Sequence, residues 1–301
     1  MRPLPLTIFL LAASCGRAPD ARPASARKAP TAQLSQTAPD SSRIPPGPTE
    51  GFIALGPGFE YARMTLPDAA APGDHLLRVV RIDPKIAHLK VEASSVGDRF
   101  PRVASGWAGD APVVAVINAA MFKKDMRTNL GFLRVGDHVQ NGAWAKEENS
   151  LLALDPLDAA DPSATLANLS CADRDALIGR YRTLVQSIRM VGCARDNVWA
   201  PDDRPWSAAL TGADSQGRLL LLFVRSPYTM HALVEMLLAL PLDLVALHYG
   251  DGGPPASLFV RAPGLEERNV GSFEARAHDK DDNVVEWPLP NVLVATPGDA
   301  R

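Results

Sequence analysis

Short apolar runs, several of them alternating with polar residues, follow one another along most of the chain. Two of these runs, residues 75–83 and 87–94, are separated by Pro-Lys-Ile and predict a β-hairpin. The next run, residues 113–117, is continuously apolar, which is typical of a strand buried on both faces. The run ends at Asn118, so we expect a polar side chain at the end of a buried strand.

The remaining apolar runs are short and predict further strands. Residues 131–142 predict a second hairpin, which turns at Gly136 and Asp137. Residues 204–224 predict two strands joined by a polar turn that contains glycine. Single strands are expected at residues 150–156, 183–192, 242–249, 256–260 and 291–295.

Two segments carry a helical pattern. Residues 229–241 are expected to form a helix that Thr229 caps and Pro241 ends. One face of this helix carries the apolar residues Met230, Leu233, Val234, Leu237 and Leu238. Residues 173–182 predict a second helix with Asp173 as a possible N-cap. Many strands with two or three helices predict an α+β fold, a single domain in which a mixed, largely antiparallel β-sheet packs with a few helices.

The first residues have the layout of a signal peptide. Arg2 precedes a short apolar core, and small residues stand directly before Cys15. This arrangement resembles a bacterial lipobox, so residues 1–14 are predicted to be a lipoprotein signal peptide and Cys15 the lipidated first residue of the mature protein. An ordinary cleaved signal peptide with an incidental cysteine is the alternative.

The segment after Cys15 has a composition that does not support a folded core. Residues 16–50 contain seven prolines and no aromatic residue. We therefore interpret residues 15–50 as the lipidated cysteine with a disordered tether, and residues 51–301 as the folded domain. The expected location is the bacterial cell envelope, with a lipid anchor in the membrane and the domain facing the periplasm or the exterior.

The overall composition excludes some functions. A chain with 46% hydrophobic and 22% charged residues is an ordinary globular protein. Its net charge of -3 provides no basic surface for nucleic acid, so no nucleic-acid partner is expected. No pattern of residues points to a cofactor.

Two cysteines remain in the folded part, Cys171 and Cys193. Export places them in an oxidising compartment, where they are expected to form a disulfide; two buried free thiols are the alternative. The histidines show no metal-ligand spacing and no Cys-x-x-Cys motif is present, so no metal site is predicted.

Three strand ends carry polar residues that fit a common site: Asn118, Arg204 and Asp251. Asp251 belongs to the sequence His-Tyr-Gly-Asp-Gly-Gly, residues 248–253, directly after an apolar strand. An aspartate between glycines is either ordinary turn chemistry or a carboxylate placed for catalysis. Rigid strands present such groups to one pocket, but each residue also has a purely structural explanation.

The order of these segments resembles the phosphodiester glycosidase family, over Phe52 to Thr296. Site residues follow from matching the family motifs one by one. The resemblance implies catalytic roles for Asn118, Arg204 and Asp251. It implies substrate-binding roles for Gln186, Ser187, Gly252, Gly253, Ser257 and Asn291.

The chain departs from the family pattern at two places. Ala119 and Ala120 replace two glycines, and Met121 replaces an aromatic residue. Residues 254–256, Pro-Pro-Ala, stand between the Asp-Gly-Gly motif and Ser257, where the family has a glycine and a hydroxyl residue. A shifted loop, altered substrate choice and lost activity all fit this change.

The chemistry implied by the resemblance is cleavage of a sugar-1-phosphodiester bond in an envelope or extracellular glycan. Asp251 serves as nucleophile or base, because glycosidases stabilise an oxocarbenium-like transition state with carboxylates. Arg204 binds the phosphate, whose oxygens suit a guanidinium fork. His248 and Asp243 are weak candidates for a general acid, and His248 also fits a packed strand residue.

Other functions remain open at this point. A non-catalytic envelope lipoprotein that binds a glycan or a protein partner through the same pocket fits the altered loop. A metal-dependent hydrolase needs clustered ligands that the sequence does not contain. The arrangement of Asn118, Arg204 and Asp251 in space discriminates among these alternatives.

Overall fold

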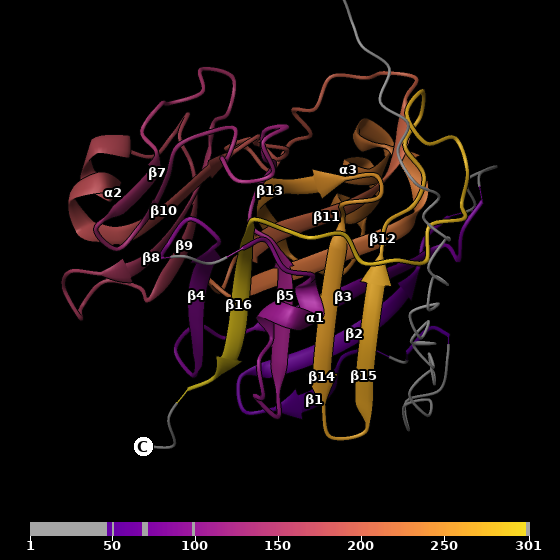
Figure 1. Ribbon diagram of the computed structural model, residues 1–301, viewed down its shortest axis with the longest axis horizontal. Coiled ribbons are helices and arrows are strands. Elements are labelled where there is room, and N and C mark those ends of the chain that lie inside the picture. Colours follow the sequence, from indigo (N-terminus) through magenta and orange to yellow (C-terminus); the bar gives the residue numbers. More distant parts are fainter. Residues whose placement is uncertain (1–46, 50, 68–71, 98–99, 299–301) are drawn as a thin grey trace, which may run out of the picture. The chain divides into compact units, whose positions relative to one another are not determined.

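The computed structural model describes residues 47–49, 51–67, 72–97 and 100–298. In these residues strands dominate and the helices are few, which confirms the predicted α+β class (Figure 1). All pairings between the named strands are antiparallel. Within the described part of the chain, no helix is long and apolar enough to span a membrane.

The strands form three sheets. The first sheet has the order β1 (Ile53–Gly56), β2 (Phe59–Thr65), β3 (Leu76–Ile82), β12 (Leu219–Thr229), β11 (Pro205–Asp214), β13 (Leu244–Gly252). The second has the order β15 (Leu265–Val270), β14 (Ser257–Ala262), β5 (Val114–Asn118), β16 (Asn291–Pro297), β4 (Ala87–Ala93). The third has the order β7 (His138–Asn141), β6 (Leu133–Val135), β10 (Tyr181–Ser187), β8 (Ser150–Pro156), β9 (Ala164–Asn168).

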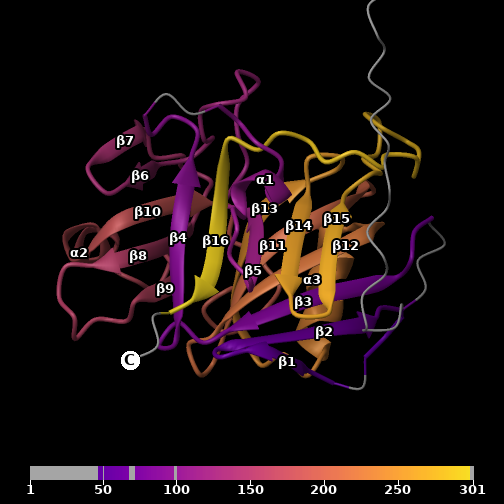
Figure 2. The same cartoon turned by 60° about the horizontal axis from the view of Figure 1, so that its bottom comes forward.

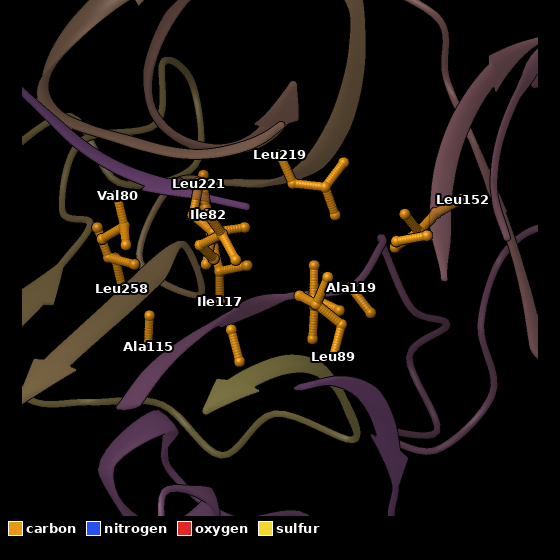
Figure 3. Packing of buried hydrophobic residues seen from close by; sticks show 14 of the residues in the cluster. Val80, Ile82, Leu89, Ala115, Ile117, Ala119, Leu152, Leu219, Leu221 and Leu258 are labelled. Carbon is orange, nitrogen blue, oxygen red and sulfur yellow. The ribbon is translucent and has the colours of Figure 1, made fainter. Parts of the chain in front are cut away.

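The main hydrophobic core lies where the first two sheets face each other. Ile82 and Leu221 of the first sheet point toward Ile117 and Leu258 of the second (Figure 3). Leu152 of β8 brings the third sheet into the same core. The continuous apolar run of β5 is buried along its whole length, as its pattern predicted.

Short helices cover the outer faces of the sheets. α3 (Met230–Ala239) packs its apolar side against β12 and β3, and α1 (Ala104–Trp107) packs on the second sheet (Figure 2). α2 (Arg174–Arg180) covers the third sheet. Both predicted N-caps are present. The Thr229 hydroxyl accepts a hydrogen bond from Ala232 N at 3.3 Å, and the Asp173 carboxylate accepts one from Asp175 N at 2.9 Å.

The predicted hairpin of residues 75–94 is wrong, although both of its strands exist. β3 pairs with β2 and β12, whereas β4 pairs with β16 in the second sheet. The turn between β3 and β4 therefore carries the chain from one layer to the other. Alternation of apolar and polar residues reports that a segment is a strand, but it does not name the partner of that strand. The sequence also did not reveal β1, β2, β9 and β15.

The expected disulfide is confirmed. Cys171 and Cys193 are bonded, and their Cα atoms lie 6.3 Å apart. The bond joins the segment before α2 to the loop that follows β10. Cys15 and the predicted signal peptide lie outside the described residues, as does most of the predicted tether.

Candidate active site

Asp251 lies near the end of β13, which is an edge strand of the first sheet. Its outer side is nevertheless covered, because Met190 N donates to Leu247 O at 2.9 Å and Tyr249 N donates to Ile188 O at 3.0 Å. These hydrogen bonds satisfy main-chain groups on the open side of β13. The segment that carries Ile188 and Met190 therefore covers this edge, which explains why an edge strand is buried and apolar.

Three of the residues singled out in the sequence come together at the ends of β13, β5 and β14. The Asn118 amide Nδ2 faces the Asp251 carboxylate at 3.4 Å and donates to Pro255 O at 3.1 Å. Its Oδ1 accepts from Ser257 N at 2.8 Å. Asn118 is buried and thereby ties the Pro-Pro loop, Ser257 and Asp251 into one arrangement. The altered loop after the Asp-Gly-Gly motif is thus held to the site.

The Asp251 carboxyl is half-buried and carries a perturbed pKa. Removal from water raises its pKa to about 7, and the nearby Glu274 carboxylate adds to the increase. Hydrogen bonds from Gly252 N, at 2.9 Å, and from Asn118 act in the opposite direction. A carboxyl group with a pKa near neutrality exchanges protons readily, which is the property that acid–base catalysis requires.

Glu274 is a site residue that the sequence reasoning missed. It forms an isolated β-bridge with Trp206, and its Oε2 lies against Gly253, at 2.5 Å from where a Cβ of that residue would be. Burial raises the pKa of Glu274, and the neighbouring His278 lowers it. The only sequence signal was a lone acid in a polar stretch, which is too common to single out.

Aromatic side chains stand beside these carboxyl groups. The Trp199 ring lies 5.4 Å from the Tyr249 ring and 6.4 Å from the Trp206 ring, measured between centroids. The Trp206 indole and the Tyr249 hydroxyl lie against Gly252. The resemblance implied that Gly252 and Gly253 bind substrate. In the structure Trp206, Tyr249 and Glu274 occupy the space beside them.

Arg204 is not part of this cluster. Its side chain is half exposed and faces Asp202, with 3.5 Å between the guanidinium and the carboxylate. The side chain of the same segment that reaches the Asp-Gly-Gly turn belongs to Trp206. The backbone beside Arg204 pairs with the segment that carries Glu274, since Pro205 O accepts from Ala275 N at 3.1 Å. Arg204 precedes the first residue of β11, so strand pairing does not fix the direction of its side chain.

The side chains of Gln186 and Ser187 form hydrogen bonds with main-chain atoms of neighbouring segments. The Gln186 Oε1 accepts from Phe132 N at 2.9 Å and from Ala145 N at 3.0 Å. Its Nε2 donates to Ala145 O at 2.8 Å and to Glu148 O at 2.6 Å, and the Ser187 hydroxyl donates to Tyr249 O at 2.6 Å. These bonds occupy both ends of the Gln186 amide.

Asn291 pairs with the strands of the second sheet beside the site, but its side chain is bonded to Gln140. Its Oδ1 accepts from Gln140 Nε2 at 2.6 Å, and Gln140 Oε1 in turn accepts from Asn129 N at 2.8 Å. Asn291 O accepts from Ala119 N at 3.2 Å, so its backbone supports the segment after Asn118.

Neither suggested general acid is placed for that role. His248 is fully buried, and burial lowers its pKa to about 4, so the imidazole is neutral at ordinary pH. Its ring nitrogens lie 3.0 Å from Ala119 O and 3.2 Å from the Ser150 hydroxyl, which fits the packed strand residue. Asp243 is exposed at the other end of β13 and interacts with Ser215 and Arg195.

Two cavities lie away from the carboxyl groups. One, of about 480 Å³, is lined by residues that include Trp144, Lys146 and Gln186. The other, of about 1470 Å³, is lined by loops at the opposite ends of the sheets, and neither is lined by Asp251. Among residues 47–298 that the structure describes, no three His, Cys, Asp or Glu side chains are grouped to bind a metal ion.

The comparisons with known proteins decide the family. The model of the phosphodiester glycosidase family matches residues 111–296. This chain belongs to the phosphodiester glycosidase family. The matched range begins just before β5 and contains Asn118, Arg204, Asp251 and Glu274, so the whole carboxyl cluster lies within the family domain.

Solved structures share the fold. The catalytic domain of zebrafish N-acetylglucosamine-1-phosphodiester alpha-N-acetylglucosaminidase, auto-inhibited by its pro-peptide, aligns with a TM-score of 0.55 and 11% identity, over 86% of this chain and 87% of that one. A hypothetical protein from Synechocystis aligns with a TM-score of 0.52 and 10% identity, over 79% of this chain and 62% of that one. A comparison with curated proteins yields no match. At these identities the structural likeness concerns the fold alone.

Proposed function

We propose that the protein is an exported hydrolase that cleaves a sugar-1-phosphodiester bond in an envelope or extracellular glycan. The observation that supports this most directly is the meeting of Asp251, Asn118 and Ser257 at three strand ends inside the family domain. Asp251 supplies the carboxylate, as nucleophile or as base for water, and Asn118 orients it.

The leaving group in this reaction is a phosphate ester, which is a weak base and needs little protonation. It carries a negative charge, which a cation would bind better than a carboxyl group. Arg204 is the proposed phosphate ligand. Its exposed guanidinium pairs with Asp202, and it would have to turn toward Asp251 when substrate binds.

Arg204→Ala should lower kcat/KM for a sugar-1-phosphodiester roughly 10- to 100-fold, mainly through KM, because a charge-assisted hydrogen bond is lost. Steady-state kinetics on the substrate found by screening purified protein against sugar-1-phosphodiesters would measure this. Arg268→Ala is the matched control, since Arg268 is an exposed arginine paired with Glu266 on β15. Equal kinetics in the two variants would remove Arg204 from the site. A wild type that cleaves no such substrate would favour a glycan-binding envelope lipoprotein.

The location belongs to the same proposal. We infer that Cys15 is acylated and anchors the domain to the envelope, on the grounds of the apolar run and small residues before it. Metabolic labelling with a fatty-acid analogue in a bacterial host should mark the wild type, whereas Cys15→Ser should lose the label. Equal labelling of both proteins would contradict the anchor, and secretion of an unlabelled, shortened wild type would support an ordinary signal peptide.

A further inference from the structure

The cavity of about 480 Å³ lies at the third sheet, between the loop of residues 143–149 and the start of α2. Trp144, Lys146 and Asn149 line it from the loop, and Arg174 lines it from α2. Its volume falls within the usual range of small-molecule sites in proteins. The cavity is therefore large enough to hold a single sugar ring.

The loop that carries these residues is fastened by the side chain of Gln186. The Gln186 amide oxygen accepts from Ala145 N at 3.0 Å, and the amide nitrogen donates to Ala145 O at 2.8 Å and to Glu148 O at 2.6 Å. Glu148 itself is buried, with its carboxyl group against Gly131. The loop is thus fixed to β10 at two points, so a ligand does not have to order it on binding.

Trp144 forms an aromatic wall of the cavity. Its ring stacks on the ring of Phe132, with 4.4 Å between the centroids and 6° between the planes, and the Arg174 guanidinium lies 5.0 Å from its centroid. Within the described residues, neither the Trp144 indole N–H nor the Asn149 side-chain amide forms a hydrogen bond. A fixed aromatic wall with open N–H groups suits a sugar ring, which has apolar C–H faces and a rim of hydroxyls.

The charges that line the cavity leave one cation without a partner. Arg174 pairs with Asp175 at 3.1 Å, and the Asp173 carboxylate accepts from Asp175 N as the cap of α2. Lys146 is exposed, and in the part of the chain that the structure describes it forms no ion pair. A free ammonium group beside a sugar-sized cavity favours a sugar that carries a phosphate or a carboxylate.

The wall of the cavity lies a few residues from Asp251. The Ser187 hydroxyl donates to Tyr249 O at 2.6 Å, so the end of β10 meets β13 at this point. Gln186 precedes Ser187 by one residue, and Asp251 follows Tyr249 by two residues, which is about 7 Å along a strand. A glycan of more than one unit can therefore span the distance from Asp251 to the cavity.

We propose that this cavity binds a saccharide unit that carries a phosphate or a carboxylate, with Lys146 toward the anionic group and Trp144 and Asn149 toward the ring. As a subsite for the unit beyond the bond cleaved at Asp251, it rests on the proposed function and narrows the substrate to an anionic glycan. Gln186 is then a positioning residue, which gives it a part in substrate binding although its amide is bonded to main-chain atoms.

The test follows the indole N–H signal of Trp144 by NMR in the purified chain, with its five tryptophans labelled with ¹⁵N. Trp144→Phe removes this signal and thereby assigns it, while phenylalanine can still stack on Phe132. Glucose 6-phosphate and glucuronate should shift the signal in a saturable manner and bind at least about fivefold more tightly than glucose, because each adds a charge-assisted contact. Inorganic phosphate alone should bind more weakly than glucose 6-phosphate.

Lys146→Gln should weaken the binding of glucose 6-phosphate about 10-fold and leave the binding of glucose unchanged, because only the charge-assisted hydrogen bond is lost. Lys85→Gln is the matched control. Lys85 is also an exposed lysine that lines a cavity, the larger one at the opposite ends of the sheets, so its variant should bind both sugars like the wild type. Thermal melts verify that each variant is folded.

The outcomes separate this proposal from the proposed function. A Trp144 signal that no sugar shifts, equal affinities for glucose and glucose 6-phosphate, or equal weakening in the two lysine variants would overturn the cavity proposal. Inorganic phosphate that binds as tightly as glucose 6-phosphate would also overturn it, by showing an anion site without sugar recognition. If the sugars bind as expected but no sugar-1-phosphodiester is cleaved, the cavity stands as a glycan-binding site and the proposed function fails. If a phosphodiester is cleaved and the Trp144 signal does not move, only the cavity proposal fails.

Discussion

Asp251→Asn is expected to lower turnover of any substrate of this site at least about 100-fold while the fold remains intact. Asparagine keeps the shape of the side chain and can still accept from Gly252 N. It cannot ionise, donate an acidic proton or attack an anomeric carbon. The measurement is turnover at saturating substrate, beside a thermal melt. A folded variant with near-normal turnover would show that Asp251 has only a structural role in the turn.

The same substitution should change stability in a pH-dependent manner. The pKa of Asp251 rises from 3.8 to about 7 on folding, so the folded state binds a proton that the unfolded state releases. The stability contributed by this group is therefore present below pH 4 and decreases as the pH rises to 7. At pH 8 Asp251→Asn should be more stable than the wild type by roughly 1–3 kcal/mol, a value reduced for the partial exposure of the group. The difference should vanish near pH 4 in denaturant titrations. A variant that is less stable at pH 8 would contradict the desolvated carboxyl.

Gly250→Ala should destabilise the protein by about 2–4 kcal/mol and lower activity in the fraction that folds. A Cβ at this position would come to 2.6 Å from Ala209 O and 3.1 Å from Asn118 O. Both are backbone atoms in the centre of the site, so neither can move without disturbing β11 or β5. Chemical denaturation with the wild type as reference gives the free energy of unfolding.

Gly179→Ala is the matched control for that experiment. Gly179 lies in α2, and a Cβ there would meet no atom within 4 Å. Alanine should stabilise this helix by about 0.5–1 kcal/mol. If Gly250→Ala were as stable as the control, this result would contradict the conclusion that β5, β11 and β13 approach too closely at this glycine to accept a Cβ.

Local sequence patterns correctly predicted the elements whose structure depends on residues close together in the chain. The spacing of apolar residues and the cap at Thr229 placed α3 correctly, and Gly136-Asp137 placed the turn between β6 and β7. The buried run ending at Asn118 became β5, because a run that is apolar on both faces has only one stable environment.

Contacts between distant segments were beyond the reach of those patterns. The sequences of β3 and β4 predicted a hairpin, yet β3 pairs with β12 in the first sheet and β4 with β16 in the second. Gln186 was expected at the substrate, but loops at Phe132 and Ala145 need its amide to satisfy their own backbone groups. The need to satisfy these main-chain groups depends on the folded arrangement of the loops, so it cannot be read from the sequence near Gln186.

The sequence by itself determined the α+β class, the family and the disulfide partners, and it indicated that Asn118 and Asp251 lie close together. It did so because strand periodicity, the presence of two cysteines in the folded part, and motif order can all be read from the chain alone. Only the tertiary structure decided that Trp206 rather than Arg204 lies at the Asp-Gly-Gly turn, and that Glu274 joins Asp251. The physical reason is that the facing of a side chain depends on strand register, and register is selected by burial of the whole sheet rather than by any residue near the site.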